Sequence, residues 1–166
     1  SQVYIRMKHN RCKKVGMTSF NHVLPHNTPQ KEVEDLIQQL NSSSEVHGIL
    51  VQLPLPSHLD EEAVLNKISL EKDVDGFHPY NIGRLTQRNP LLRPCTPWGI
   101  IMLLDHIGET YKGRNAVIVG ASNIVGRPMS LELLLAGATT TVCHRFTSDL
   151  EAHVGRADIL VVADRK

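Results

Sequence analysis

The chain has 166 residues, of which 41% are hydrophobic and 21% charged, as is typical of a globular protein that buries a core. Its 18 basic and 17 acidic residues leave a formal net charge of +1, which gives no basic excess for a nucleic-acid or membrane partner. No apolar run is long enough to cross a bilayer, and no signal peptide is visible. The 3 cysteines lie far apart and the 9 histidines are scattered, which indicates a cytoplasmic protein with reduced thiols and no metal site.

The first half of the chain predicts a mixed α/β unit. Gly16 is expected to end an opening helix, and Thr28 is expected to cap the next one with Pro29 at its first helical position. The apolar run over 46–52 is typical of a buried parallel strand. In chain order the predicted elements are a helix over 1–15, a short strand over 20–24, a helix from 28 to about 40, the strand over 46–52 and a helix over 59–68.

A loop-rich stretch with four prolines, over about 73–97, is the expected linker to a second unit. Beyond it, helices and strands alternate, which predicts parallel strands joined by right-handed crossovers in a Rossmann-like sheet. The predicted elements are a helix over 97–106, a strand over 115–119, a helix over 125–136, a strand over 139–143, a short helix near 149 and a strand over 159–163. The fold class is therefore α/β with two domains, over 1–93 and 94–166.

Both ends of the sequence indicate that the complete protein is longer. The chain starts inside a predicted helix that has no cap of its own. It stops just after the third strand of a sheet that a second set of strands normally completes. We therefore expect the first domain to lack its N-terminal part and the second domain to be only a first half.

The segment over 119–128 joins a predicted strand to a predicted helix and has features of a phosphate-binding turn. Gly120 allows a tight turn, and Ser122 with the free amides at the helix start can receive a phosphate. Gly126 allows the helix to pack closely against the strand. Because Ser122 replaces the middle glycine of the usual G-x-G-x-x-G pattern, an ordinary strand-to-helix turn explains the spacing equally well.

Arg145 follows the next predicted strand, where a dinucleotide-binding fold places the residue that reads the ribose. An acidic residue there would hold a 2′-hydroxyl, whereas an arginine suits a 2′-phosphate. The sequence therefore favours NADP over NAD. The alternative is a surface arginine that happens to follow a strand.

Four residues of the first unit are candidates for chemistry. Tyr4 and Lys8 share one helix face, and a lysine in a partly dry cleft can move protons, although a solvated lysine beside a packed tyrosine fits the spacing better. Gln52 ends a predicted strand at the edge where ligands bind in parallel sheets. Asp75 suits either a loop cap or an acceptor for adjacent N–H donors of a ligand.

Several sequence blocks carry a resemblance to a known family. Two are long: Gly-Ile-Leu-Val-Gln-Leu-Pro-Leu-Pro over 48–56 and Gly-Ala-Ser-Asn-Ile-Val-Gly-Arg-Pro over 120–128. The shorter ones are Tyr4-x-x-x-Lys8, Lys-Asp-Val-Asp-Gly over 72–76 and Pro-Cys-Thr-Pro-x-Gly over 94–99. Together they resemble the methylenetetrahydrofolate dehydrogenase/cyclohydrolase family. The blocks over 77–81 and 144–147 are most similar to bacterial members.

The resemblance implies an enzyme of one-carbon metabolism. Such an enzyme oxidises 5,10-methylenetetrahydrofolate with NADP and hydrolyses the 5,10-methenyl product to 10-formyltetrahydrofolate. It implies a folate-binding catalytic domain over 1–93 followed by an NADP-binding Rossmann-like domain over 94–166. It also implies a cytoplasmic homodimer, associated through the cofactor domain, that supports purine biosynthesis.

The resemblance also assigns roles to individual residues. Lys8 is the central hydrolytic residue, Tyr4 stacks on the folate, and Gln52 orients the lysine. Asp75 holds the pterin. The implied substrate contacts further include Ser1, Val51 and Leu53. The implied cofactor contacts are Gly120, Ala121, Ser122, Ile124, Val125, Gly126, Arg127, His144, Arg145 and Thr147.

The sequence departs from the family in places that bear on activity. The opening helix and strand and the second half of the cofactor domain are absent from it, and Asp164 and Arg165 stand where a small or apolar residue and a glycine are usual. An inactive remnant that retains only nucleotide binding or dimerisation is therefore the alternative. A shikimate or amino-acid dehydrogenase relative is disfavoured, because the block over 51–56 and the Tyr4–Lys8 pair have no role there.

Overall fold

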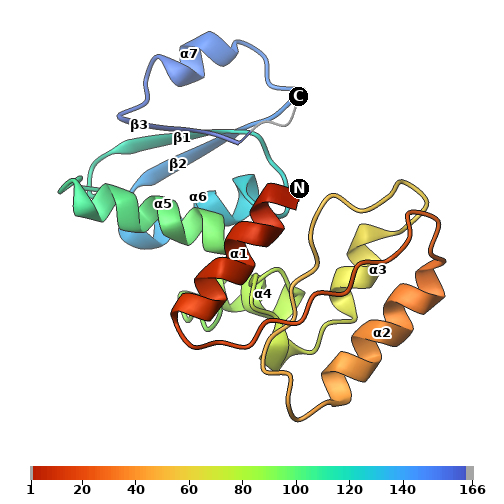
Figure 1. The fold of residues 1–166 in the computed structure, drawn as a ribbon. Helices are drawn as coiled ribbons and strands as arrows, with labels where there is room; N and C mark the ends of the chain where they lie inside the picture. The colour runs from red at the N-terminus through yellow and green to blue at the C-terminus, as the bar shows by residue number, and fades with distance from the viewer. Residues whose placement is uncertain (1, 164–166) are drawn as a thin grey trace.

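The computed structural model describes residues 2–163 and confirms the α/β class (Figure 1). The first half contains α1 (Gln2–Lys14), α2 (Gln30–Ser42), α3 (Glu61–Asn66), the 3₁₀ helix η1 (Leu70–Lys72) and α4 (Pro79–Thr86). The second half contains α5 (Cys95–His106), β1 (Asn115–Val119), α6 (Gly126–Ala136), β2 (Thr139–Cys143), α7 (Leu150–Val154) and β3 (Ile159–Val162). Among these described helices, none has both the length and the apolar character that a membrane crossing requires.

The sheet of the second half is parallel, with β1 between β2 and β3. Because the two crossovers lead to opposite edges of the sheet, their right-handedness places α6 and α7 on opposite faces. Figure 1 shows α5 and α6 covering one face and α7 the other. Ala116 and Ile118 of β1 pack with Met129 and Leu133 of α6 in a core on the α5–α6 face. Because the strands are parallel, β1 and β2 end at the same edge of the sheet, and α6 begins at that edge.

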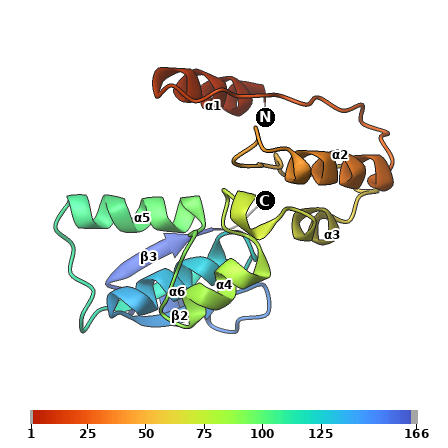
Figure 2. The same cartoon turned by 90° about the horizontal axis from the view of Figure 1, so that it is seen from below.

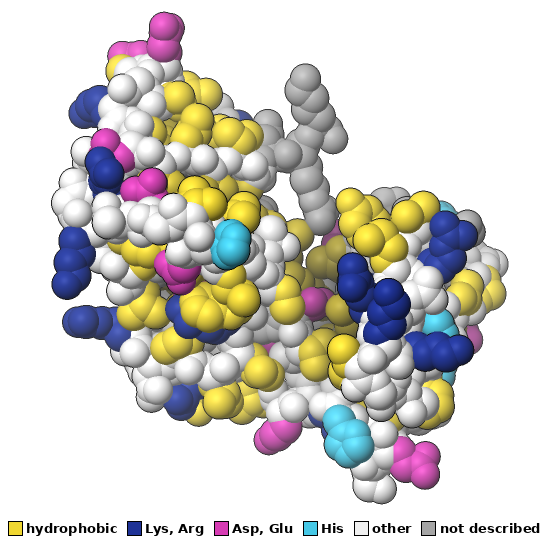
Figure 3. Space-filling model, turned by 60° about the vertical axis from the view of Figure 1, so that its left-hand side comes forward, with side chains coloured by type: hydrophobic (Ala, Val, Ile, Leu, Met, Phe, Trp, Pro, Cys, Tyr) yellow, Lys and Arg dark blue, Asp and Glu magenta, His cyan; other side chains and the backbone are white. Residues whose placement is uncertain are grey.

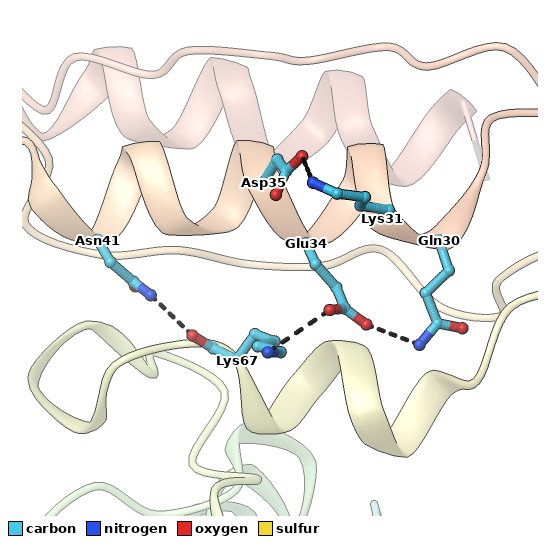
Figure 4. A network of polar contacts seen from close by, with 6 residues as sticks. All are labelled: Gln30, Lys31, Glu34, Asp35, Asn41 and Lys67. Carbon is cyan, nitrogen blue, oxygen red and sulfur yellow. Dashed lines mark hydrogen bonds and ion pairs between the residues drawn. The ribbon is translucent and has the colours of Figure 1, made fainter.

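The first half has a smaller core between α2 and α3. Val33 and Ile37 of α2 pack with Ile49, Val64 and Ile68. Polar contacts join the same two helices at the surface, as Figure 4 shows. These contacts are the ion pair between Glu34 and Lys67 at 3.5 Å and the bond from the Asn41 amide to the Lys67 carbonyl at 2.7 Å.

Two strand predictions in the first half are wrong. The segment over 20–24 forms no strand, and Phe20 and Val23 are 64% and 80% exposed. The run over 46–52 makes a single parallel bridge, between Ile49 and Asp73, instead of a full strand. Both runs have suitable side chains, but a strand also needs a partner strand. Among the described residues, the run over 20–24 pairs with no other segment, and the run over 46–52 pairs only through the bridge to Asp73.

The predicted linker contains a helix. In α4 the ring of Pro79 occupies the first turn, and the His78 side chain accepts a hydrogen bond from the Tyr80 amide. The helix packs against α6, with Asn81 and Leu85 buried (Figure 2). The four prolines over 73–97 therefore mark helix starts and turns between helices, and not an open loop.

Two helix starts differ from the prediction. Helix α2 begins at Gln30, so Pro29 stands at the cap position. The Thr28 hydroxyl donates to the Pro25 carbonyl at 2.8 Å and does not cap the helix. Helix α5 begins at Cys95 and so includes two residues before the predicted start at Pro97.

Candidate functional site

The structure brings Lys8 and Gln52 together from positions 44 residues apart. The Lys8 Nζ donates to Gln52 Oε1 at 3.3 Å. The other end of the Gln52 amide donates from Nε2 to the Leu53 carbonyl at 3.1 Å. Because the Nε2 group is engaged by the backbone, the amide oxygen is the end that faces the lysine. Figure 3 shows a hollow between the two halves of the surface, with hydrophobic side chains and an acidic one inside it.

Asp75 belongs to the same neighbourhood. Its side chain is half-buried, and this burial raises the pKa of its carboxyl group. The Lys8 ammonium acts in the opposite direction and lowers that pKa, while the charge of Asp73 raises it further. Lys8 therefore stands close enough to Asp75 for their charges to interact. Among the residues that the structure describes, no group donates a hydrogen bond to the Asp75 carboxylate, which leaves it available to a ligand.

The loop-capping role belongs to Asp73 and not to Asp75. The Asp73 carboxylate is buried and accepts hydrogen bonds from the backbone amides of Phe77 and His78 at 3.3 and 2.9 Å. It also accepts from the Asn81 side chain at 2.8 Å. Of the two aspartates in the block over 72–76, Asp73 therefore stabilises the fold, and Asp75 is the one with free acceptor atoms.

Lys72, in the same block, is structural too. Its Nζ donates to the carbonyl oxygens of Leu40, Asn41 and Ser43 at 2.9, 2.7 and 2.7 Å. These carbonyls lie at the C-terminal end of α2, where a cation is favourable. Lys72 therefore anchors α2 to the chain that leads into Asp75.

Cys95 is a site residue that the residue-by-residue reading of the sequence did not single out. Burial raises the pKa of its thiol, the negative charges of Asp75 and Asp73 raise it further, and the Lys8 ammonium acts in the opposite direction and lowers it. The thiol Sγ also donates to the Val74 carbonyl at 3.6 Å. The only sequence signal was its position in the block over 94–99. Cys95 therefore joins Lys8 and Asp75 at one place although it lies in the second half of the chain.

The other predicted substrate residues, Tyr4, Val51 and Leu53, lie near this cluster, but their side chains make none of the hydrogen bonds described above. Tyr4 lies one helical turn before Lys8, as predicted, with 66% of its surface exposed. Val51 packs against the core between α2 and α3, and Leu53 is half-buried. Ser1 lies outside the described residues. The structure thus gathers Lys8, Gln52 and Asp75, with Tyr4 on the adjoining turn of α1.

The turn between β1 and α6 is tight and internally bonded. Gly120 has a φ of +111°, and a Cβ atom at Gly126 would collide with the Gly120 carbonyl. The Ser122 hydroxyl oxygen accepts from the amides of Val125 and Gly126 at 3.2 and 3.3 Å. Two of the amides expected to be free for a phosphate are therefore occupied by Ser122. Its hydroxyl hydrogen remains a donor.

Two further contacts surround this turn. Arg127 Nε donates to the Ala121 carbonyl at 3.1 Å and so braces it. The Gly120 amide donates to the Cys143 carbonyl at 2.9 Å, which joins the ends of β1 and β2. Ala121 and Ile124, also expected at the cofactor site, lie in the same turn and are half-buried. The candidate cofactor residues after β1 thus lie next to those after β2.

After β2 the chain makes a second turn. The His144 amide donates to the Thr147 hydroxyl at 2.9 Å, and the Phe146 amide donates to the His144 ring at 3.2 Å. The Arg145 guanidinium lies over the Phe146 ring at 4.6 Å, and both side chains are exposed. His144 and Thr147 therefore shape the turn that presents Arg145 to solvent.

Fold and site together define a two-part α/β protein with a nucleotide-binding type of turn at the carboxyl end of a central parallel strand. Residues 1–75 match the model of the tetrahydrofolate dehydrogenase/cyclohydrolase catalytic domain, and residues 94–165 match the model of the NAD(P)-binding domain of the same enzymes. The chain belongs to the tetrahydrofolate dehydrogenase/cyclohydrolase family.

Solved structures agree with this assignment. The bifunctional enzyme FolD of Campylobacter jejuni, a methylenetetrahydrofolate dehydrogenase/cyclohydrolase, is 47% identical with a TM-score of 0.93, and the match covers 98% of this chain and 58% of that one. The Trypanosoma brucei FolD, solved with NADP and an inhibitor, is 37% identical with a TM-score of 0.94, covering 99% and 57%. The NAD-dependent 5,10-methylenetetrahydrofolate dehydrogenase of Saccharomyces cerevisiae is 18% identical with a TM-score of 0.83, covering 99% of this chain and 65% of that one, and it shares the fold. The chain thus spans less than two thirds of these proteins.

Proposed function

We propose that this chain holds the folate-binding and nucleotide-binding residues of an NADP-dependent methylenetetrahydrofolate dehydrogenase that also hydrolyses its methenyl product. The contact between Lys8 and Gln52, beside a half-buried Asp75 with free acceptor atoms, carries the proposal. Family membership supports it. The boundary between folate-binding and cofactor domains falls at 93/94.

In the proposed hydrolysis the protein chiefly moves protons. The methenyl carbon of the substrate is cationic and already electrophilic, so water attacks it once positioned. The attacking water loses both of its protons in turn, one released to solvent and one delivered to N5. The bond from this carbon to N5 breaks with its electron pair left on N5, and the formyl group remains on N10. Lys8 carries the proton between these atoms, and Gln52 Oε1 keeps its Nζ in place.

The other first-half residues bind the folate. The Asp75 carboxylate accepts hydrogen bonds from the adjacent N–H donors of the pterin. Tyr4 stacks on the flat part of the substrate from the turn that precedes Lys8. Val51, Leu53 and Ser1 complete the contact surface. Burial of a free carboxylate at Asp75 supports this arrangement, because the ligand would supply the missing donors.

NADP is the proposed cofactor, and the residues present fit it. The absence of a Cβ at Gly126 lets the helix start close against Gly120, which leaves the turn and the positive end of α6 to face a pyrophosphate. Ala121, Ser122, Ile124, Val125 and Arg127 complete that turn, and His144, Arg145 and Thr147 form the adjoining one. Bound NADP supplies an oxidised nicotinamide, which accepts a hydride.

Assay of both reactions on the purified chain tests this function. Formation of NADPH from methylenetetrahydrofolate and loss of methenyltetrahydrofolate absorbance report the two activities separately. The alternative is an inactive remnant that retains nucleotide binding or dimerisation alone. Binding of NADP without either reaction would favour that alternative over the proposed enzyme.

Replacing Arg145 with alanine is expected to weaken NADP binding by about ten- to a hundredfold, the value of one charge-assisted contact to a phosphate, and to leave NAD binding nearly unchanged. Isothermal titration with both nucleotides measures this selectivity. The matched control is Arg156→Ala, because Arg156 is also exposed but lies after α7, where its Nε donates to the Ala152 carbonyl. Equal weakening of NAD and NADP would contradict the assignment to the 2′-phosphate.

We also propose a cytoplasmic homodimer that associates through the cofactor domain and supplies one-carbon units for purine biosynthesis. Exposed apolar side chains on or beside α5 and α6 support a second copy as the occupant of this surface: Met102, Leu103, Ile107 and Leu134. Leu103→Glu is expected to convert the dimer to a monomer in sedimentation-velocity runs, because it places a charge in an apolar interface. A monomeric parent chain, or a dimeric variant, would contradict this interface.

A further inference from the structure

We propose that Arg93 and Glu132 form a positioning pair that sets the folate site relative to the nucleotide site. The proposal rests on the proposed function, in which a hydride must pass between the two sites. The pair lies outside both of them and joins the segment before α5 to the middle of α6. Arg93 Nε and Nη2 donate to Glu132 Oε1 and Oε2 at 2.9 and 2.5 Å, a two-point contact between planar groups.

The burial of Glu132 shows that the pair is built into the fold. The Glu132 side chain is 0% exposed and Arg93 is 23% exposed. A carboxylate buried on a helix is strongly unfavourable without a partner, so Glu132 constrains where Arg93 must lie. The Arg93 guanidinium also lies over the Trp98 ring of α5 at 3.7 Å. One arginine side chain is thus held by both α5 and α6.

The backbone of the same arginine lies against the folate site. Gly76 directly follows Asp75 and has a φ of +70°. A Cβ atom at Gly76 would stand 2.7 Å from the Arg93 carbonyl carbon and 2.8 Å from the Pro94 nitrogen, which is too close for any side chain. Arg93 therefore contacts the loop that carries Asp75 through its backbone and α6 through its side chain. Helix α6 begins at Gly126, in the proposed pyrophosphate turn.

This geometry makes a different demand on each reaction. Hydride transfer requires the folate carbon and the nicotinamide to meet at a defined distance, and small misplacements lower such rates strongly. Hydrolysis of the methenyl product uses Lys8, Gln52 and Asp75, which do not depend on where the nucleotide lies. Loosening the pair is therefore expected to lower the dehydrogenase rate selectively.

The test is Glu132→Gln, which keeps the shape of the side chain and removes its charge. We expect the dehydrogenase kcat to fall at least tenfold, with the KM for NADP and for the folate, and the hydrolysis rate, all within twofold of the parent chain. Arg93→Lys, which keeps the cation but cannot make the two-point contact, should show the same pattern and serves if Glu132→Gln does not fold. Glu34→Gln is the control, since it changes the Glu34–Lys67 ion pair between α2 and α3 within the first half.

A merely structural role would give another result. Equal loss of both reactions in the two variants, or no change in either reaction, would overturn the positioning role. A second readout does not depend on activity: the distance between spin labels on unnatural amino acids at positions 31 and 151 in α2 and α7. We expect Glu132→Gln to broaden this distribution and Glu34→Gln to preserve it. If the parent chain shows neither reaction, the proposed function fails, and this distance measurement alone supports or overturns the positioning role.

Discussion

Replacing Lys8 with methionine is expected to lower the rate of methenyltetrahydrofolate hydrolysis by about a hundredfold or more, the usual contribution of a positioned proton-transfer group. Methionine keeps the length and apolar stem of lysine but has no group that can carry a proton. Lys8 is exposed, and its contact with Gln52 Oε1 is at the surface, so loss of the ammonium should change the free energy of unfolding by less than about 0.5 kcal/mol. Hydrolysis rate and thermal melting of the same preparation measure both effects.

A lysine on the same helix provides the control. Lys13 is exposed and lies near the end of α1. Lys13→Met removes the same charge from α1 without touching Gln52 and should leave hydrolysis within about twofold, as expected for a surface charge remote from the chemistry. If Lys8→Met turns over the substrate as fast as the parent chain, the proposed role of Lys8 is wrong. If Lys13→Met is as slow as Lys8→Met, the net charge of the helix matters and not proton transfer at one atom.

The second half of the fold could be read from the sequence because its signals are local. The bounds of β1 and β2 agree with the predicted strands, and Gly137, with a φ of +108°, ends α6 as a glycine after a helix does. In the first half the apolar runs over 20–24 and 46–52 suggested strands, but strand formation depends on partners that local pattern does not reveal. The helix α4 was missed although Pro79 at its start is itself a helix-start signal.

The site was predictable only in part, for a related reason. Spacing alone could not join Lys8 to Gln52, because nothing local relates positions 44 residues apart. The resemblance supplied that pairing, and the structure shows the contact. Neither spacing nor resemblance revealed that Ser122 occupies two amides of its own turn. Nor did the sequence decide whether Asp75 caps a loop or binds a ligand, and it gave no sign that Asp73 makes the capping hydrogen bonds.

Asp73→Ala is expected to destabilise the fold by about 3 kcal/mol, because it leaves buried donors without their acceptor. The amides of Phe77 and His78 and the side chain of Asn81 all lose the carboxylate. Urea denaturation followed by circular dichroism measures the loss. The control is Asp35→Ala, which removes an exposed ion pair with Lys31 and should cost no more than about 0.5 kcal/mol. A loss for Asp73→Ala as small as that of the control would contradict its capping role.

Asp75→Asn is expected to stabilise the fold at neutral pH, whereas Asp73→Ala, at a position only two residues away, destabilises it. Burial raises the pKa of the Asp75 carboxyl above that of the unfolded chain, so the folded state is favoured at low pH, and this advantage is lost as the pH rises through the folded pKa. At neutral pH the charged form therefore weakens the fold, and asparagine should raise the melting temperature. The gain should fade as the pH falls from the folded pKa toward about 4, and it should be absent at lower pH, where the aspartate is protonated in both the folded and the unfolded chain. Folate affinity should fall at the same time, because a carboxylate that matches adjacent N–H donors is lost. A variant that is less stable at pH 7 and binds folate normally would show that Asp75, like Asp73, serves the fold.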